Sequence, residues 1–195
     1  MTKFLTLLLL LFTFICTSQS KTDTYESILQ AKDTTWLKEI ITFPFGFAPE
    51  LQYEGYEDLR FAKNWSKPES PEFWTYTLAW NINLKKPLSI AQLETDLQFY
   101  YDGLMGVVNK DPDFKIPSSI IKLSSMDRGT LKGTIQVYDS FHSKKVITLH
   151  IMIEQQYCEE KQSYTPIFRV SIKDFDAPIW QELQSVKLRK DFCEL

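Results

Sequence analysis

The sequence predicts an α+β domain, in which an antiparallel sheet of about five or six strands carries two helices packed on one face. Residues 72–84 alternate between large apolar and small or polar side chains, residues 89–108 carry an apolar stripe at helical spacing, and three further strand patterns lie between residues 130 and 173. The order of strands, helix, strands and helix argues against a doubly wound parallel sheet. An open sandwich or barrel is the alternative architecture.

The first residues have the layout of a secretory signal peptide. Lys3 precedes an apolar run from Phe4 to Ile15, and small or polar residues follow up to Ser20. This run of about 12 residues is too short to cross a bilayer as a helix. We expect residues 1–18 to be removed, with cleavage after Ser20 as the alternative. A buried apolar helix is the other interpretation of this run. Lipidation of Cys16 is also conceivable in an exported chain, but the bulky Ile15 before it argues against a lipidation site.

The rest of the chain is expected to comprise a loose leader at 19–35 and a single domain at 36–195, exported to the periplasm or outside the cell. The whole chain has a formal net charge of −3. No basic stretch favours nucleic acid as a partner. After the leader, no segment is long and apolar enough to span a membrane. An unknown protein or a small ligand is therefore the expected partner.

Two cysteines follow the leader, Cys158 and Cys193. An oxidising compartment would allow a disulfide between them. Two free buried thiols are the alternative, because the sequence does not show whether the two Cα atoms lie within reach.

The N-terminal half of the domain has three candidate strands. Residues 36–44 predict a strand or a short helix that ends at Pro44. Residues 56–61 predict a strand with Leu59 and Phe61 on one face and Asp58 and Arg60 on the other. Residues 72–84 predict a half-buried antiparallel strand. Its expected apolar face consists of Trp74, Tyr76, Leu78, Trp80, Ile82 and Leu84.

A helix is expected at 89–108, because Ser89 and Gln92 form a capping box at its start. Residues 120–126 remain open, with a short strand as one interpretation. Strands at 130–138, 145–154 and 165–173 have short connections and predict a meander. A last helix is expected near residue 176, with Asp176 as its cap and Pro178 in its first turn.

Signatures of common catalytic sites are missing from the sequence. There is no G-x-S-x-G, no H-E-x-x-H, no paired C-x-x-C and no glycine-rich phosphate loop. We therefore expect no cofactor and no metal site, and we assign no catalytic residue. His142 is expected in a solvated loop and His150 in a packed strand, although either could act as a base.

A ligand-binding site is predicted from Tyr53, Glu57, Asp58, Arg60, Trp65 and Trp74. Carboxylates beside an arginine can transfer protons if burial shifts their pKa values, but Asp58 and Arg60 could equally form a surface ion pair. The aromatic residues of this stretch could line a groove or fill the core. Trp65 lies in a polar loop, where an exposed tryptophan is a natural contact residue. The aromatic residues that could line a groove or fill the core are Trp65, Phe73, Trp74, Tyr76 and Trp80.

Four segments, 36–44, 47–50, 55–61 and 73–80, resemble a set of small exported bacterial proteins of unassigned function. The resemblance covers about a quarter of the chain. It implies a secreted single domain, and it carries over no catalytic residue.

Three functional hypotheses follow. The first is a non-catalytic binding or accessory domain at the cell envelope or outside the cell. The second is a hydrolase that uses the carboxylates of Glu54, Glu57 and Asp58 beside Arg60, for instance on saccharides. The third is a carrier of a hydrophobic ligand, which requires a cavity between helix and sheet.

Overall fold

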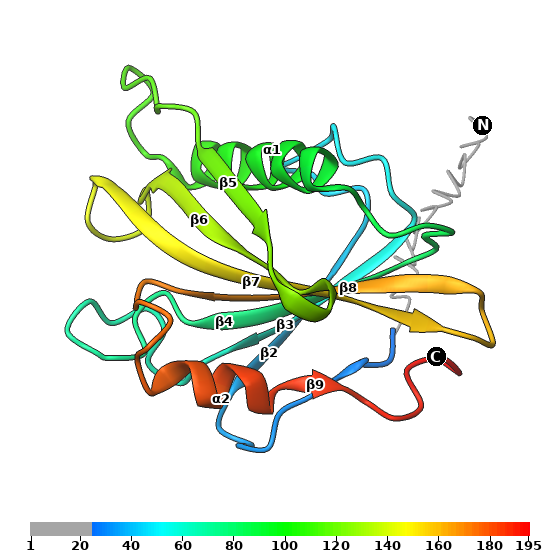
Figure 1. Ribbon diagram of the computed structural model, residues 1–195. Helices are drawn as coiled ribbons and strands as arrows, with labels where there is room; N and C mark the ends of the chain where they lie inside the picture. Colours follow the sequence, from blue (N-terminus) through cyan, green and yellow to red (C-terminus); the bar gives the residue numbers. More distant parts are fainter. Residues whose placement is uncertain (1–24) are drawn as a thin grey trace, which may run out of the picture.

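The computed structural model describes residues 25–195, so the predicted signal peptide lies outside the described residues. An antiparallel sheet of seven strands, in the order β2-β3-β4-β8-β7-β6-β5, forms the centre of the domain (Figure 1). The strands are β2 (Leu37–Thr42), β3 (Gly55–Phe61), β4 (Tyr76–Ile82), β5 (Ile120–Ser125), β6 (Leu131–Tyr138), β7 (Val146–Cys158) and β8 (Ser163–Ser171). The predicted antiparallel sheet is confirmed, but it has more strands than the five or six expected.

The sheet consists of two meanders joined edge to edge. Strands β2, β3 and β4 follow one another, and so do β5, β6, β7 and β8. The meanders meet where β4 pairs with β8, with Leu78 opposite Phe168. Helix α1 (Ile90–Val108) connects the end of the first meander to the start of the second. The predicted meander of the last three strands is confirmed, and the open segment 120–126 forms its additional edge strand.

The two helices lie on opposite faces of the sheet, with α1 above it and α2 (Ile179–Ser185) below it in Figure 1. The prediction of both helices on one face is therefore wrong. Leu78 and Trp80 of β4 belong to the core under α1, whereas Ala79 between them belongs to the core under α2. Strand alternation thus supplies both cores. Sequence periodicity could not assign either helix to a face.

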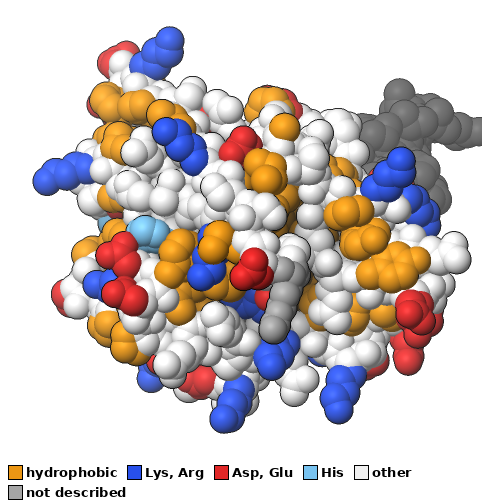
Figure 2. Space-filling model, in the orientation of Figure 1, with side chains coloured by type: hydrophobic (Ala, Val, Ile, Leu, Met, Phe, Trp, Pro, Cys, Tyr) orange, Lys and Arg blue, Asp and Glu red, His pale blue; other side chains and the backbone are white. Residues whose placement is uncertain are grey.

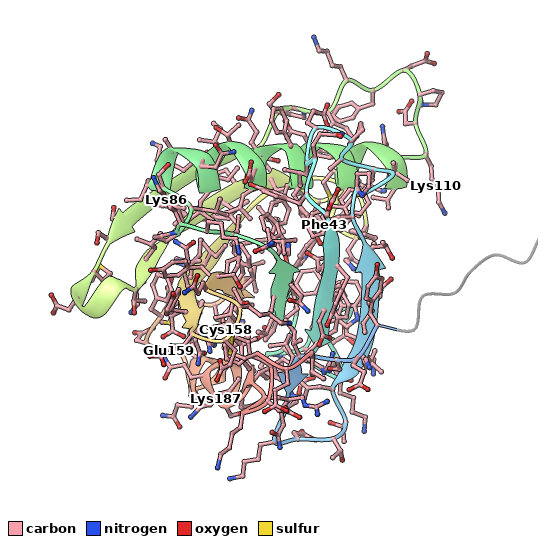
Figure 3. The ribbon with its side chains drawn as sticks, turned by 90° about the vertical axis from the view of Figure 1, so that its right-hand side faces the viewer. Phe43, Lys86, Lys110, Cys158, Glu159 and Lys187 are labelled. Atoms are coloured by element: carbon pink, nitrogen blue, oxygen red, sulfur yellow. A yellow bond between two sulfur atoms is a disulfide. The ribbon has the colours of Figure 1, made fainter. Side chains whose placement is uncertain are left out.

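Helix α1 begins as predicted. The Ser89 hydroxyl oxygen accepts a hydrogen bond from the Gln92 backbone N–H at 3.2 Å, which stabilises the first turn. Leu93, Leu97 and Tyr101 of its stripe are buried, and so is Met105, which the predicted stripe did not include. In Figure 3, the space between α1 and the strands is filled with side chains, and Phe43 lies beside the helix. The predicted cap of α2 is not formed, because Pro178 occupies its N-cap position without a side-chain hydrogen bond.

Strand β4 differs from the prediction at its start and in its burial. It begins at Tyr76, and Trp74 lies in a turn with a φ of 51°. Thr77 and Ala79, on the face expected to be solvated, are also fully buried. Because β4 lies in the middle of the sheet and both faces are covered, small residues on the second face fit beneath α2 and its neighbours.

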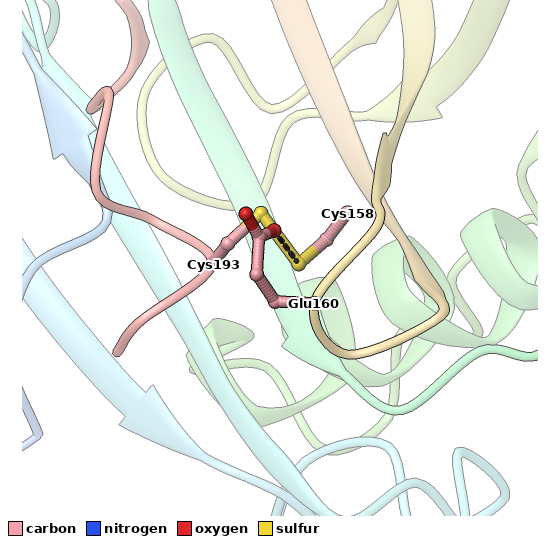
Figure 4. Close-up of side chains that lie close together, drawn as sticks. All are labelled: Cys158, Glu160 and Cys193. Carbon is pink, nitrogen blue, oxygen red and sulfur yellow. Dashed lines mark hydrogen bonds between the residues drawn. A yellow bond between two sulfur atoms is a disulfide. The ribbon is translucent and has the colours of Figure 1, made fainter.

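A second, two-stranded sheet lies on the α2 face, where β1 (Leu29–Gln30) pairs with β9 (Lys187–Leu188). Ile28 and Leu29 are buried, so the described part of the segment 19–35 is not the loose leader that was expected. The predicted pairing of Cys158 with Cys193 is confirmed, with Cα atoms 5.6 Å apart in a disulfide (Figure 4). It connects the C-terminal tail to the end of β7. Within residues 25–195, no helix is long and apolar enough to cross a membrane.

Candidate functional site

A pocket of about 330 Å³ lies between α1, the β2–β3 edge of the sheet and three loops. We call it the aromatic pocket, because aromatic rings make most of its wall and only one side chain in its lining is charged. Its lining residues are Glu39, Ile41, Phe47, Leu59, Phe61, Trp65, Trp74, Tyr76, Tyr100, Leu104, Val108 and Phe141. A mainly apolar pocket with a few polar groups is the usual form of a small-ligand site.

The loop between β3 and β4 brings the two tryptophans of the pocket together. The backbone N–H of Trp74 donates to the carbonyl oxygen of Trp65 at 2.8 Å, so the loop closes at the pocket. Trp74 has a φ of 51°, a backbone conformation that is unfavourable for a bulky residue and that often occurs at functional sites. Its indole Nε1 is buried and has no hydrogen-bond partner among residues 25–195.

Phe141 reaches the pocket from the loop between β6 and β7. The buried carboxylate of Asp139 accepts hydrogen bonds from the backbone N–H groups of Phe141 and His142 at 3.0 Å and of Ser143 at 2.7 Å. Burial opposes ionisation of Asp139, but these N–H donors hold its pKa below the usual range. The ionised carboxylate therefore fixes the loop that presents Phe141.

Glu57 lies beneath the pocket, between β3 and α1, and is fully buried. Its Oε2 accepts a hydrogen bond from Trp80 Nε1 at 2.8 Å, and its Oε1 accepts one from the Tyr100 hydroxyl at 3.0 Å. Burial raises the pKa of Glu57 to about 8, and the negative charge of Glu39 adds to the rise. Glu57 is therefore mostly protonated at neutral pH.

Tyr100 connects this buried carboxyl group to the pocket, because it lines the pocket and also binds Glu57. Burial raises its pKa well above the usual range, and the charge of Glu57 contributes. Tyr76, which also lines the pocket, forms a hydrogen bond with the Tyr101 hydroxyl. The pocket thus has two tyrosines in its wall whose hydroxyls are bound to buried partners.

Asp58 and Arg60 lie on the other face of β3, away from the pocket. The Asp58 carboxylate is paired with the Arg60 guanidinium, and both side chains are buried. Asp58 Oδ2 also accepts from the Leu29 backbone N–H at 2.8 Å, and Arg60 donates to the Leu29 carbonyl oxygen at 2.9 Å. We call this group the β1 clamp, because it holds β1 against the sheet. The surface ion pair considered from the sequence is in fact a buried one.

The structure therefore separates the predicted site residues into three groups. Trp65 and Trp74 line the aromatic pocket, and Glu57 lies beneath it. Asp58 and Arg60 belong to the β1 clamp. Tyr53 lies outside the pocket lining, where its hydroxyl donates to Asp96 Oδ2 at 2.6 Å and its ring packs against Trp80.

The two histidines do not line the pocket. His142 packs against the rings of Phe73 and Trp65, with centroids 5.3 and 6.2 Å away, so it is less solvated than expected. His150 lies in β7, and its Nε2 is 2.9 Å from Asp174 Oδ1.

Three important pocket residues were missed in the sequence. Tyr100 belongs to the apolar stripe of α1, where it was expected only to pack. Glu39 is an acidic residue in the edge strand β2, and Phe141 is an aromatic residue in a polar loop. Each of these exceptions is a weak signal, but their positions come from three elements whose contacts no local spacing reveals.

A larger hollow of about 640 Å³ lies on the α2 face, lined in part by Lys132, Glu154, Arg169 and Lys187. Arg169 is already paired with Glu154 at 2.8 Å and donates to the carbonyl oxygens of Leu183 and Val186. Figure 2 shows acidic and basic side chains spread together over the face that it draws. Because Arg169 already has protein partners, this hollow is a weaker candidate than the aromatic pocket.

Cys158, Cys193 and Glu160 form the one cluster of potential metal ligands in the described part of the chain. The two cysteines are joined to each other, and Glu160 is 3.5 Å from Cys158 Sγ (Figure 4). A disulfide sulfur carries no thiolate charge, so the oxidised cluster does not provide a zinc site.

The comparisons with known proteins leave the function open. No protein-family model, curated protein or solved structure gives a significant match to this chain. The resemblance to small exported bacterial proteins therefore stays a prediction, and the functional inference depends on the geometry of the site.

Proposed function

We propose that this protein is a non-catalytic binding domain that takes a small, largely apolar ligand into the aromatic pocket. The observation that carries the proposal is the pocket itself, a hollow of about 330 Å³ walled by aromatic rings from four separate parts of the chain. Its volume is at the lower end of the range for small-molecule sites, which favours a small ligand. This proposal unites the first and third sequence hypotheses.

Two further features support a binding role. The φ of 51° at Trp74 costs free energy that the surrounding structure must offset, and this conformation keeps the indole in the pocket wall. The buried indole N–H has no partner among the described residues, and an unsatisfied buried donor is uncommon in native structures. Packing of the indole alone leaves this donor without a partner.

The hydrolase hypothesis has less support. Glu57 and Asp58 point to opposite faces of β3, and Asp58 is occupied by Arg60 and by the backbone of β1. Glu54 is exposed. The three carboxylates therefore do not converge on one substrate position, as acid–base catalysis by a pair would require.

Export remains part of the proposal. The apolar N-terminal run and the disulfide both support a chain that matures in an oxidising compartment. A periplasmic or extracellular domain with a small apolar pocket could capture a ligand at the cell envelope.

The binding proposal is tested with N-phenyl-1-naphthylamine, a small uncharged probe whose fluorescence rises when it leaves water. Val108 lines the pocket, whereas its neighbour Val107 is 69% exposed and does not. We expect Val108→Phe to fill the pocket and weaken probe binding by about tenfold, a loss of about 1.4 kcal/mol. The matched control Val107→Phe should change the affinity by less than about twofold.

Equal affinities of the two variants for the probe would place binding elsewhere and contradict the proposal. Saturable binding that Val108→Phe alone weakens would support it. Circular dichroism of both variants establishes that each has folded before the affinities are compared.

A further inference from the structure

The charge distribution around the aromatic pocket narrows the kind of ligand, if the proposed binding function is accepted. Glu39 is the one charged side chain among the lining residues, and no lysine or arginine contributes to the wall. No ion pair joins Glu39 to any of the basic side chains that the structure describes. An apolar pocket with an uncompensated carboxylate at its side attracts a positive group and repels an anion.

The charge of Glu39 also acts on Glu57, which lies beneath the pocket. Glu39 and Glu57 lie on the same face of the sheet, on the adjacent strands β2 and β3. In the register of these strands Glu39 pairs with Leu59, and Ile41 pairs with Glu57. Alternation places all four of these side chains on that face. After burial, the charge of Glu39 is among the influences that raise the pKa of Glu57 and of Tyr100. Because Glu57 is mostly protonated at neutral pH, Glu39 is the negative charge that a cation in the pocket would meet.

Three aromatic rings of the pocket stand at steep angles to one another. Trp65 and Trp74 have centroids 6.5 Å apart and planes at 80°, and Trp65 and Phe141 are 6.2 Å apart at 84°. The third pair, Trp74 and Phe141, is 5.9 Å apart at 68°. The three rings therefore pack edge to face on one another, and we call them the aromatic corner of the pocket. Ring faces that line a pocket can hold a quaternary ammonium group by cation–π attraction.

We propose that the ligand of the aromatic pocket is a small organic cation, an amine or quaternary ammonium on an apolar body. The aromatic corner and Glu39 bind the positive group, and the apolar residues of α1 contact the body. The indole N–H of Trp74, one of these rings, is buried and has no hydrogen-bond partner among the described residues. The larger hollow on the α2 face differs, because Lys132, Arg169 and Lys187 all contribute to its lining.

The charge preference is tested with three compounds that share a six-carbon chain: hexyltrimethylammonium, 1-hexanol and hexanoate. Titration at pH 7, followed by tryptophan fluorescence and calorimetry, gives the three affinities for the full exported chain. We expect the ammonium compound to bind about fivefold to tenfold more tightly than hexanol, and hexanoate to bind most weakly.

Two substitutions separate the contributions. Glu39→Gln should weaken the binding of hexyltrimethylammonium by about threefold and leave the affinity for hexanol unchanged. The effect is small because Glu39 is exposed and solvent screens its charge. Trp65→Leu keeps apolar bulk but removes the π face, so it should remove most of the preference for the ammonium over hexanol. Trp65→Phe keeps a ring and should retain most of that preference.

The outcomes distinguish the two proposals. If hexanol or hexanoate binds as tightly as the ammonium compound, and Val108→Phe still weakens binding, the cation inference is wrong while the binding function stands. If none of the three compounds binds, and N-phenyl-1-naphthylamine is also insensitive to Val108→Phe, both proposals are wrong.

Discussion

Glu57 and Asp58 are adjacent in the sequence and both are fully buried, but they face opposite sides of β3. On the α1 face, Glu57 has only neutral hydrogen-bond partners, Trp80 and Tyr100, and burial raises its pKa to about 8. On the α2 face, Asp58 is paired with the Arg60 guanidinium and with the backbone of β1. The difference shows that the partner decides what a buried carboxyl group does: one belongs to a neutral network beneath a pocket, the other to an ionic clamp.

The largest expected effect concerns the pH dependence of stability through Glu57. Its pKa in the folded protein, about 8, lies above its ordinary value of 4.5, so the unfolded chain releases this proton first as pH rises. Stability from Glu57 is therefore fully present below about pH 4.5 and is lost towards pH 8, by up to about 5 kcal/mol. We expect Glu57→Gln to remove this loss, and urea unfolding at pH 5, 6.5 and 8 measures it.

The exposed neighbour Glu54 provides the matched control, since Glu54→Gln should leave the pH dependence of the wild type intact. The groups around Glu57 that can also affect its titration are Glu39, Asp58, Tyr76, Tyr100 and Tyr101. A wild-type protein and a Glu57→Gln variant with parallel stability profiles would show that Glu57 ionises normally, against this account.

The second largest effect on stability is expected at the β1 clamp, where the buried carboxylate is ionised and paired rather than neutral. Asp58→Asn leaves the Arg60 guanidinium buried without its counterion, so we expect a loss of about 3 to 4 kcal/mol at pH 7. Asp113, an exposed residue in the loop after α1, is the control, and Asp113→Asn should change stability by less than about 0.5 kcal/mol. Probe binding by folded Asp58→Asn should remain, because the clamp faces away from the pocket. Its loss would mean that the two faces are coupled.

The disulfide should behave like the clamp, because it also lies on the α2 side of the molecule. Figure 3 shows Cys158 on the side of the sheet away from α1. Replacing Cys158 and Cys193 together by serine should lower the unfolding free energy by about 3 kcal/mol. Affinity for hexyltrimethylammonium, measured below the unfolding transition, should stay within about twofold of the wild type. A tenfold loss of affinity would contradict the separation of the faces.

Sequence reasoning found the elements whose signals are local. Ser89 with Gln92 and the stripe behind them predicted α1, and the alternation at residues 56–61 assigned Asp58 and Arg60 to one face of β3. What it missed comes from distant contacts. The sequence left open whether Asp58 and Arg60 form a surface ion pair, and β1, some 30 residues earlier in the chain, covers them.

The pocket was only partly predictable for the same reason. Trp65 and Trp74 were recognised as contact candidates because they are aromatic residues near a polar loop. The alternation also placed Trp74 inside a strand, whereas the loop closure between Trp74 and Trp65 puts it in a turn. Glu39 and Tyr100 line the same pocket as these tryptophans because β2 and α1 both pack on β3. This packing cannot be predicted from the pattern of any single segment.

The smallest expected effect is the stability change of Glu39→Gln, which tests whether this residue acts in binding without supporting the fold. Glu39 is exposed on an edge strand, so Glu39→Gln should change the unfolding free energy by less than about 0.5 kcal/mol. Urea unfolding at pH 7 measures this value, beside the threefold effect expected on the ammonium compound. A large loss of stability would show that Glu39 supports the fold, and its effect on ligand affinity could not then be assigned to charge.

The most direct measurement of the central claim is an NMR titration of the five tryptophan indole N–H signals with hexyltrimethylammonium. Trp65 and Trp74 line the aromatic pocket, whereas Trp36 and Trp180 belong to the core on the α2 face. We expect the signals of Trp65 and Trp74 to shift in a saturable manner, with a smaller change at Trp80 above Glu57. Shifts at Trp36 and Trp180 with Trp65 and Trp74 unmoved would contradict the aromatic pocket as the binding site.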